Sequence, residues 1–214
     1  MKKISVSFLS SKNIPMDLRK LNDTDVDFIH VDIMDGKFVP AKTMPFREMR
    51  HIYQYTSKRL DVHLMVKEPS KFIPLYAELN TEYIAIHVES EEDIIKNLEL
   101  IKSFSIKTGL AINPDTPVKE LIPYLPYLDE VLVMSVYPGK GGQEFIVEVE
   151  KKIKELKALL QSYHLSTVIN VDGGVNNITK KYCEDADIIT SGSYVVSASD
   201  FQEKITSLRW LPVI

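Results

Sequence analysis

The sequence predicts an α/β protein built as a closed (β/α)8 TIM barrel, in one compact domain that spans residues 1–214. Short β-branched apolar runs alternate with longer amphipathic stretches, which is typical of repeated βα units around a parallel sheet. The length of 214 residues lies just above the lower limit of about 200 residues for such a barrel. The main alternative is an open doubly wound sheet, which usually carries a glycine-rich fingerprint after an early strand. No glycine precedes Gly36, so that signal is missing.

Strands and helices are expected to alternate along the whole chain. The strands are expected at residues 4–8, 28–34, 60–66, 83–88, 107–112, 130–136, 167–172 and 188–190. Amphipathic helical periodicity is clearest at residues 91–104, 147–163 and 200–208. Pro69 and Pro117 stand where further helices would begin, because proline is tolerated in the first turn of a helix.

The composition excludes several classes of protein. The chain carries 26 Lys and Arg against 30 Asp and Glu, for a formal net charge of −4, and no basic cluster dominates. A nucleic-acid-binding surface is therefore not expected. No apolar run approaches the roughly 20 residues of a membrane-spanning helix, so no membrane association is expected either. Cys183 is the only cysteine, so no disulfide can form within the chain, and we expect a reducing, cytoplasmic location.

Four of the expected strands direct polar side chains to one face near their C-terminal ends. Side chains alternate across a strand, so in strand 28–34 the aliphatic residues share the face opposite to these polar side chains. The polar residues are Ser5 and Ser7 in the first strand, His30 and Asp32 in the second, Asp61 and His63 in the third, and Asn170 and Asp172 in the seventh. Barrel enzymes hold their active sites at this end of the strands.

His30, Asp32, His63 and Asp172 form a set of two histidines and two carboxylates at equivalent strand positions. Neutral imidazole and carboxylate are the ligands that a borderline divalent cation prefers. We therefore expect one bound divalent metal ion, with zinc ahead of iron(II), manganese or cobalt. The alternative for each residue is a hydrogen-bonded buried polar group, which a lone His-x-Asp pair would favour. His87, inward on the fourth strand, is expected to be such a hydrogen-bonded residue rather than a fifth ligand.

Six of the eight glycines fall in three short segments after the last three expected strands. These six are Gly139, Gly141, Gly142, Gly173, Gly174 and Gly192. Glycine lets backbone N–H groups approach an anion closely, and loops after strands seven and eight commonly bind phosphate in such barrels. Each segment alone would indicate only a tight turn. Three segments at the same end of one barrel favour a phosphate site.

These residues resemble the motifs of the ribulose-phosphate 3-epimerase family, and the resemblance extends from Ser5 to about Ser199. The segments that carry it are residues 6–9 (VSFL), 30–40 (HVDIMDGKFVP), 61–66 (DVHLMV), 113–117 (NPDTP), 133–143 (VMSVYPGKGGQ), 171–175 (VDGGV) and 192–193 (GS). The second-strand run and the glycine-rich loop after the sixth strand are highly specific, and all segments occur in the family's order.

The resemblance implies an isomerase of the pentose phosphate pathway that interconverts D-ribulose 5-phosphate and D-xylulose 5-phosphate by inverting C3 through an enediolate. It implies His30, Asp32, His63 and Asp172 as the metal ligands, with Asp32 and Asp172 also as the catalytic acid–base pair. The implied substrate-binding residues are Ser7, His63, Gly139, Lys140, Gly141, Gly142, Gly173, Gly174, Gly192 and Ser193. Met34, Met65 and Met134 would line the pocket, with plain core packing as the alternative. The partner would be a small-molecule ketose phosphate, and family members often form homo-oligomers.

Several positions depart from the family's pattern and bear on substrate choice. Tyr137 stands where Asn, Asp or Glu is usual, Lys140 where an aromatic residue is usual, and Ala41 where asparagine is common. Lys140 could either add a charge to the phosphate or point to solvent. The nearest alternative function is the same proton chemistry on another ketose phosphate, such as D-allulose 6-phosphate. The alternative of another class is a non-catalytic sugar-phosphate-binding barrel, although binding alone would not need Asp32 and Asp172.

Overall fold

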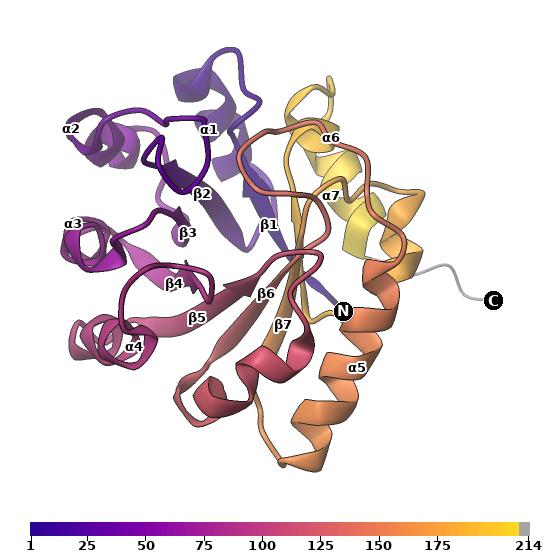
Figure 1. Cartoon of the computed structure of the whole chain (residues 1–214). Coiled ribbons are helices and arrows are strands. Elements are labelled where there is room, and N and C mark those ends of the chain that lie inside the picture. Colours follow the sequence, from indigo (N-terminus) through magenta and orange to yellow (C-terminus); the bar gives the residue numbers. More distant parts are fainter. Residues whose placement is uncertain (210–214) are drawn as a thin grey trace.

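Eight parallel strands pair in sequence order, and the last pairs with the first, so the sheet closes into a barrel (Figure 1). The structure, a computed structural model, describes residues 1–209. The strands are β1 (Lys3–Ser7), β2 (Phe28–Met34), β3 (Arg59–Met65), β4 (Thr81–His87), β5 (Lys107–Ile112), β6 (Glu130–Met134), β7 (Val168–Asp172) and β8 (Ile188–Ser191). The predicted (β/α)8 barrel is confirmed, and the pairing of β1 with β8 excludes the open sheet.

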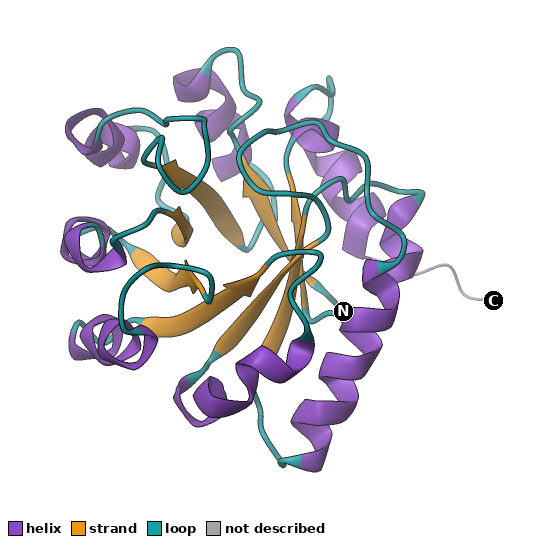
Figure 2. Ribbon diagram, viewed as in Figure 1, coloured by secondary structure: helices purple, strands orange, loops and turns teal. Residues whose placement is uncertain are grey.

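Helices lie around the outside of the barrel and connect successive strands (Figure 2). The α-helices are α1 (Ile14–Asn22), α2 (Phe46–Met49), α3 (Ile73–Ala77), α4 (Ile94–Ser103), α5 (Val149–Ser162), α6 (Ser193–Val196) and α7 (Phe201–Arg209). The 3₁₀ helices are η1 (Arg50–Gln54), η2 (Pro69–Lys71), η3 (Val118–Tyr127) and η4 (Thr179–Cys183). Among the described helices, none is long and apolar enough to cross a membrane.

The two prolines expected to begin helices lie at helix starts, one as the first residue and one as the residue just before it, but both helices are of the 3₁₀ type. Pro69 is the first residue of η2, and Pro117 immediately precedes η3. The η3 segment also contains Pro123 and Pro126. Proline lacks the N–H group that an α-helix uses and its ring clashes with the preceding turn, so the segment cannot continue as an α-helix.

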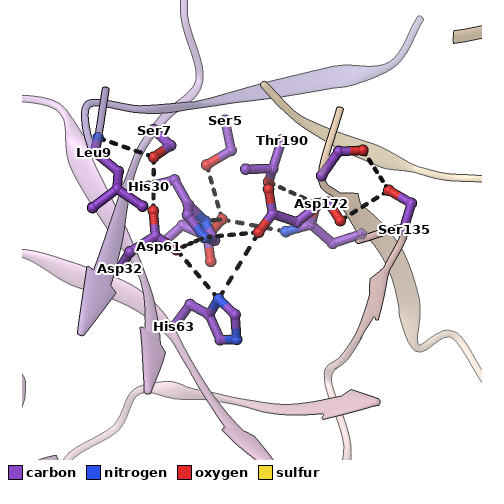
Figure 3. A network of polar contacts seen from close by, with 12 residues as sticks. Ser5, Ser7, Leu9, His30, Asp32, Asp61, His63, Ser135, Asp172 and Thr190 are labelled. Carbon is purple, nitrogen blue, oxygen red and sulfur yellow. Dashed lines mark hydrogen bonds and ion pairs between the residues drawn. The ribbon is translucent and has the colours of Figure 1, made fainter. Parts of the chain in front are cut away.

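Side chains along each strand alternate between the surrounding helices and the barrel interior. In β2, Ile29, Val31 and Ile33 are buried in the core between the barrel and the helices. His30 and Asp32 lie between them in sequence and point into the barrel (Figure 3). The alternation predicted from the sequence is therefore confirmed, and it aims the chemically active side chains inward.

Apolar side chains close the N-terminal end of the barrel interior. Phe28, Tyr83 and Ile188 form a buried cluster there, with Val168 packed against it. The rings of Phe28 and Tyr83 meet edge to face, with their centroids 5.7 Å apart. A cavity lies at the other end of the barrel, at the C-terminal ends of the strands.

The predicted elements differ from the structure chiefly at their ends. The helix predicted over 91–104 begins at Ile94, because the side chain of Asp93 accepts a hydrogen bond from the Lys96 N–H (3.1 Å) and caps the helix there. The strand predicted over 83–88 begins two residues earlier, where Thr81 pairs with Leu60 of β3. These shifts leave the inward register of the strands unchanged.

Candidate active site

Three strands bring two histidines and two aspartates to one point near the C-terminal end of the barrel (Figure 3). His30 and Asp32 lie on β2, His63 lies on β3 and Asp172 ends β7. The pairing register sets Asp32 beside His63, and one candidate ligand atom from each of the four residues lies within 4.8 Å of the others. The structure thus brings together all four residues that the sequence predicts as metal ligands.

One nitrogen of each imidazole faces one oxygen of each carboxylate. His30 Nε2 lies 3.4 Å from Asp32 Oδ1 and 3.7 Å from Asp172 Oδ2. His63 Nδ1 lies 3.4 Å and 3.9 Å from the same two oxygens. Neither nitrogen has a hydrogen-bond partner among the described residues, although both imidazoles are fully buried. Ligands about 2.1 Å from one tetrahedral ion lie about 3.4 Å from each other, so the four residues fit a divalent metal ion.

The second nitrogen of each imidazole is held by a buried side chain. His30 Nδ1 lies 2.8 Å from Asp61 Oδ2, and His63 Nε2 lies 2.8 Å from His87 Nε2. Contacts of this kind behind a metal ligand orient the imidazole and fix which nitrogen carries the proton. His87 is therefore a hydrogen-bonded barrel residue, as predicted, and Asp61 is a support that carried no predicted role.

Burial and neighbouring charges move the pKa values of the two aspartates in opposite directions. Burial raises the pKa of Asp32, but contacts with His30 and His63 outweigh burial and bring this pKa below its ordinary value. Burial and the nearby carboxylates of Asp32 and Asp61 raise the pKa of Asp172, and the charge of His30 lowers it. The net result is a pKa of about 7. At neutral pH, Asp32 is therefore ionised while Asp172 is close to its titration midpoint.

Ser7 orients one of these carboxylates. Its hydroxyl donates a hydrogen bond to Asp32 Oδ2 (2.7 Å), and it accepts one from the N–H of Leu9 (3.2 Å; Figure 3). Asp32 Oδ2 is thus occupied by Ser7, while Oδ1 faces the two imidazoles. The serine and Asp32 both lie on the pocket wall.

A cavity of about 630 Å³ opens over this cluster at the C-terminal rim of the barrel. Asp32 and Asp172 line it, whereas His30 and His63 are fully buried and lie outside the wall. The other residues predicted to bind substrate or line the pocket all belong to the wall: Ser7, Met34, Met65, Met134, Gly139, Lys140, Gly141, Gly142, Gly173, Gly174, Gly192 and Ser193.

The three methionines serve both of the roles considered for them. Met34, Met65 and Met134 lie on the pocket wall, yet each is at most 4% exposed. Met34 and Met65 pack with Val39, and Met134 packs with Leu132 and other residues of the barrel interior. Their side chains therefore form an apolar part of the wall that is continuous with the core.

Two adjacent glycines after β7 adopt a backbone conformation that favours glycine. Gly173 has φ +119° and Gly174 has φ +63°. A Cβ atom on Gly173 would lie 2.5 Å from Val136 Cγ2, and one on Gly174 would lie 2.6 Å from the backbone nitrogen of Phe145. Glycine is therefore required for the loops after β6 and β7 to pack closely against each other. Both loops contribute to the pocket wall.

The loop after β6 is held together by hydrogen bonds from Gln143, a residue for which the sequence predicted no role. Gln143 Nε2 donates hydrogen bonds to the carbonyl oxygens of Tyr137 (2.8 Å) and Lys140 (2.7 Å). Lys140 is exposed on the pocket wall, and Tyr137 is 55% exposed. Two of the three residues that depart from the family's pattern therefore lie on one loop, which the Gln143 hydrogen bonds hold together.

A buried polar layer lies beneath the cluster; its members Ser5, Asp61 and Asn170 were predicted from the sequence as inward residues, but Glu130 and Thr190 were missed. Asn170 Nδ2 donates to Glu130 Oε1 (2.9 Å), and Thr190 Oγ1 donates to Asn170 Oδ1 (3.0 Å). Ser5 Oγ donates to Asp61 Oδ2 (2.8 Å) in the same layer. Burial raises the pKa of Glu130 well above its ordinary value, and the charge of Asp61 adds to the rise. The sequence feature that could have indicated this layer is Glu130, a charged residue at an inward position of the otherwise apolar strand β6.

The fold and the site define the class of this protein. It is a (β/α)8-barrel enzyme whose imidazole–carboxylate cluster and glycine loops share the C-terminal rim of the barrel. Residues 3–196 match the ribulose-phosphate 3 epimerase family. The chain belongs to this family and, with it, to the isomerases, as the resemblance implied.

Curated relatives agree with this assignment, and a solved structure agrees with the fold. The chain is 38% identical over 209 residues to ribulose-phosphate 3-epimerase of Helicobacter pylori (strain J99), which covers 97% of this chain and 96% of that protein. It is 35% identical over 212 residues to ribulose-phosphate 3-epimerase of Bacillus subtilis (strain 168), with coverage of 97% and 98%. The structure of 3-hexulose-6-phosphate synthase from Salmonella typhimurium matches with a TM-score of 0.66 at 14% identity, over 96% of each chain. At that identity the match shows the fold alone.

Proposed function

We propose that this protein is a metal-dependent 3-epimerase that interconverts D-ribulose 5-phosphate and D-xylulose 5-phosphate. The observation that carries the proposal is the approach of Asp32 and Asp172 to one point on the pocket wall, in a chain of the ribulose-phosphate 3-epimerase family. The relatives of this chain bear that activity in their names. Two carboxyl groups that can reach one carbon from opposite faces are the acid–base pair that inversion of that carbon requires.

The two aspartates would move protons on opposite faces of the substrate. Inversion of C3 requires that its proton leaves from one face and that a proton returns to the other, through an enediolate, because C3 lies beside the ketone. One carboxylate acts as base while the other carboxyl acts as acid, and the two exchange roles in the reverse reaction. Without a bound metal ion, the pKa of Asp32 is lowered and that of Asp172 is raised, so the environments of the two carboxyls differ as those of an acid–base pair do.

His30, Asp32, His63 and Asp172 would hold one divalent metal ion. Two imidazoles and two carboxylates suit a borderline cation, and we propose zinc first, with iron(II), manganese or cobalt as alternatives. When bound, the ion stabilises the negative charge that develops on the substrate oxygens. Asp61 keeps the imidazole of His30 in place through its 2.8 Å contact with Nδ1.

The phosphate of the substrate would lie against the glycine loops after β6, β7 and β8. Backbone N–H groups in such loops can donate to phosphate oxygens, because glycine leaves no Cβ in the way. The residues proposed for this are Gly139, Gly141, Gly142, Gly173, Gly174, Gly192 and Ser193, all on the pocket wall. Lys140 stands on the same wall, where its charge would attract the phosphate dianion.

The test is an epimerase assay of the metal-replete protein on D-ribulose 5-phosphate, run in parallel with D-allulose 6-phosphate. We expect faster turnover of the pentulose phosphate. A preference of about 100-fold or more for the hexulose phosphate would reject the pentulose assignment, since a difference of this size reflects the shape of the pocket. Exchange of the C3 hydrogen in D2O is the second measurement, and its absence with metal supplied would show a barrel that binds sugar phosphates without catalysis.

A further inference from the structure

We infer that His87 and Glu89 are positioning residues that fix the tautomer of His63, so that His63 Nδ1 presents its lone pair to the metal ion. This inference rests on the metal site of the proposed function and assigns roles to residues outside the ligand set. We call the three side chains the His63–His87–Glu89 relay. It runs from β3 through the end of β4 to the loop that follows β4.

Two short contacts connect the relay. His63 Nε2 lies 2.8 Å from His87 Nε2, and His87 Nδ1 lies 2.9 Å from Glu89 Oε2. Both imidazoles are fully buried, and their ring centroids lie 5.0 Å apart. The ring of Phe38, from the loop after β2, lies 4.7 Å from that of His87. His63 Nε2 and both nitrogens of His87 are therefore in contact with buried partners within the relay rather than with bulk solvent.

The chemistry of the three groups sets the direction of every hydrogen bond. A carboxylate can only accept, so His87 Nδ1 carries the proton in its contact with Glu89. A neutral His87 then has its lone pair on Nε2, which accepts from His63 Nε2–H. A neutral His63 with its proton on Nε2 has its lone pair on Nδ1. That atom lies 3.4 Å from Asp32 Oδ1 and has no hydrogen-bond partner among the described residues.

The second carboxylate oxygen of Glu89, which does not contact His87, is also hydrogen-bonded. Glu89 Oε1 accepts hydrogen bonds from the Asn113 N–H (2.9 Å) and from the hydroxyl of Thr116. Burial raises the pKa of Glu89, but the bonds to His87, Thr116 and Asn113 outweigh burial and lower it to about 2. The carboxylate is therefore ionised, and both of its oxygens act as acceptors at neutral pH.

A lysine from α5 holds the turn that binds Glu89. Lys152 Nζ donates to the carbonyl oxygens of Asn113 (2.7 Å), Pro114 (2.7 Å) and Thr116 (2.6 Å). This turn presents the backbone N–H and the hydroxyl that fix Glu89. The orientation of a metal ligand on β3 thus depends on contacts that extend to a helix on the outside of the barrel.

The experiment measures zinc affinity by competition with a chromogenic chelator, in the full-length protein and four variants. His87→Leu removes the acceptor for His63 Nε2–H, whereas the side-chain carbonyl of His87→Gln can replace it. Glu89→Gln introduces an N–H group where both carboxylate oxygens accept. The matched control is Glu92→Gln, because Glu92 also accepts from a backbone N–H and a hydroxyl, both of Ser70, but does not contact the relay.

We expect His87→Leu and Glu89→Gln to weaken zinc binding by about 10- to 100-fold. His87→Gln should stay within about threefold of wild type, and Glu92→Gln should not change the affinity. Nitrogen-15 NMR of the metal-free wild type should place the His63 proton on Nε2. A proton on Nδ1, or wild-type affinity in His87→Leu, would overturn the inference. The NMR result does not depend on catalysis, so failure of the relay is distinct from failure of the epimerase assay.

Discussion

Asp32 and Asp172 contact the same two imidazoles, yet their pKa values shift in opposite directions. The difference follows from their partners. Asp32 lies 3.4 Å from both free imidazole nitrogens and also accepts a hydrogen bond from Ser7. Burial is the largest cause of the raised pKa of Asp172, which also lies farther from both nitrogens, at 3.7 and 3.9 Å, and faces the charge of Asp32. One carboxyl is thus held ionised while the other keeps a proton within reach of neutral pH.

Replacing either aspartate with asparagine keeps the size of the side chain but removes a proton-transfer group and an anionic ligand. We expect Asp32→Asn and Asp172→Asn each to lower kcat by roughly 10²- to 10⁴-fold, while the fold stays intact. The epimerase assay with metal content measured in the same samples checks this, and Asp23→Asn on the exposed end of α1 is the control. Near-normal turnover in either active-site variant would contradict the two-base mechanism.

Removal of the metal should lower both activity and thermal stability. A ligand that binds only the folded state stabilises it by about 2.7 kcal/mol at 100 times its Kd. For a chain of this length, that corresponds to a rise in Tm of roughly 5–11 °C. Thermal unfolding with and without zinc measures the shift. His30→Ala should abolish it and His51→Ala, at an exposed position of η1, should retain it. A wild-type Tm that is insensitive to zinc would count against the metal site.

The buried Glu130 should make the protein less stable as the pH rises. Its folded-state pKa is raised by burial and by Asp61, whereas an unfolded glutamate ionises near pH 4.5. The unfolded chain therefore releases this proton at a lower pH than the folded chain does, and the stability contributed by Glu130 is lost as pH rises above about 4.5.

A glutamine at this position cannot ionise, so Glu130→Gln should match wild type near pH 4 and exceed it at pH 7, by on the order of 1 kcal/mol. Urea unfolding at the two pH values is the measurement. Glu99→Gln, at an exposed position of α4, should show no such pH dependence. Equal stability of wild type and Glu130→Gln at both pH values would show that Glu130 is ionised in the fold.

Gly109, in the middle of β5, leaves room for the polar layer. A Cβ atom there would lie 2.8 Å from Ala85 Cβ and 2.9 Å from Glu130 Oε2. We expect Gly109→Ala to destabilise the protein by about 1–3 kcal/mol, measured by chemical unfolding, because the interior is overpacked. Adding Ala85→Gly should recover part of the loss, since it removes the contact with Ala85 Cβ and leaves those with Ala85 Cα and Glu130 Oε2, both at 2.9 Å. Strictly additive effects in this double-mutant cycle would exclude direct crowding.

Much of the candidate site could be predicted because its determinants are local. Strand periodicity places His30 and Asp32 on the same face of β2, whatever the rest of the chain does. The same periodicity places His63 and Asp172 inward on β3 and β7. The closed barrel then brings strands of equal orientation together at one rim, so four local patterns become one site. The glycine loops follow the last three strands and reach the same rim for the same reason.

What remained outside prediction depends on contacts between distant parts of the chain. Glu130 looked like the first residue of an apolar strand, but its partner is Asn170 on the next strand, and only the register between strands brings them to 2.9 Å. The 3₁₀ form of η3 was decided by two internal prolines rather than by its amphipathic pattern.

The sequence by itself determined the barrel, the inward set of histidines and aspartates, and the loops at their rim, because alternation along a strand and the placement of glycine are properties of short segments. Only the tertiary structure decided which nitrogen of each imidazole is free and what holds the other. Those choices depend on Asp61 for His30 and on His87 and Glu89 for His63. A hydrogen bond needs its donor and acceptor atoms within about 3 Å of each other. Atoms of residues that are far apart in the sequence reach this distance only through the pairing of strands and the packing of helices.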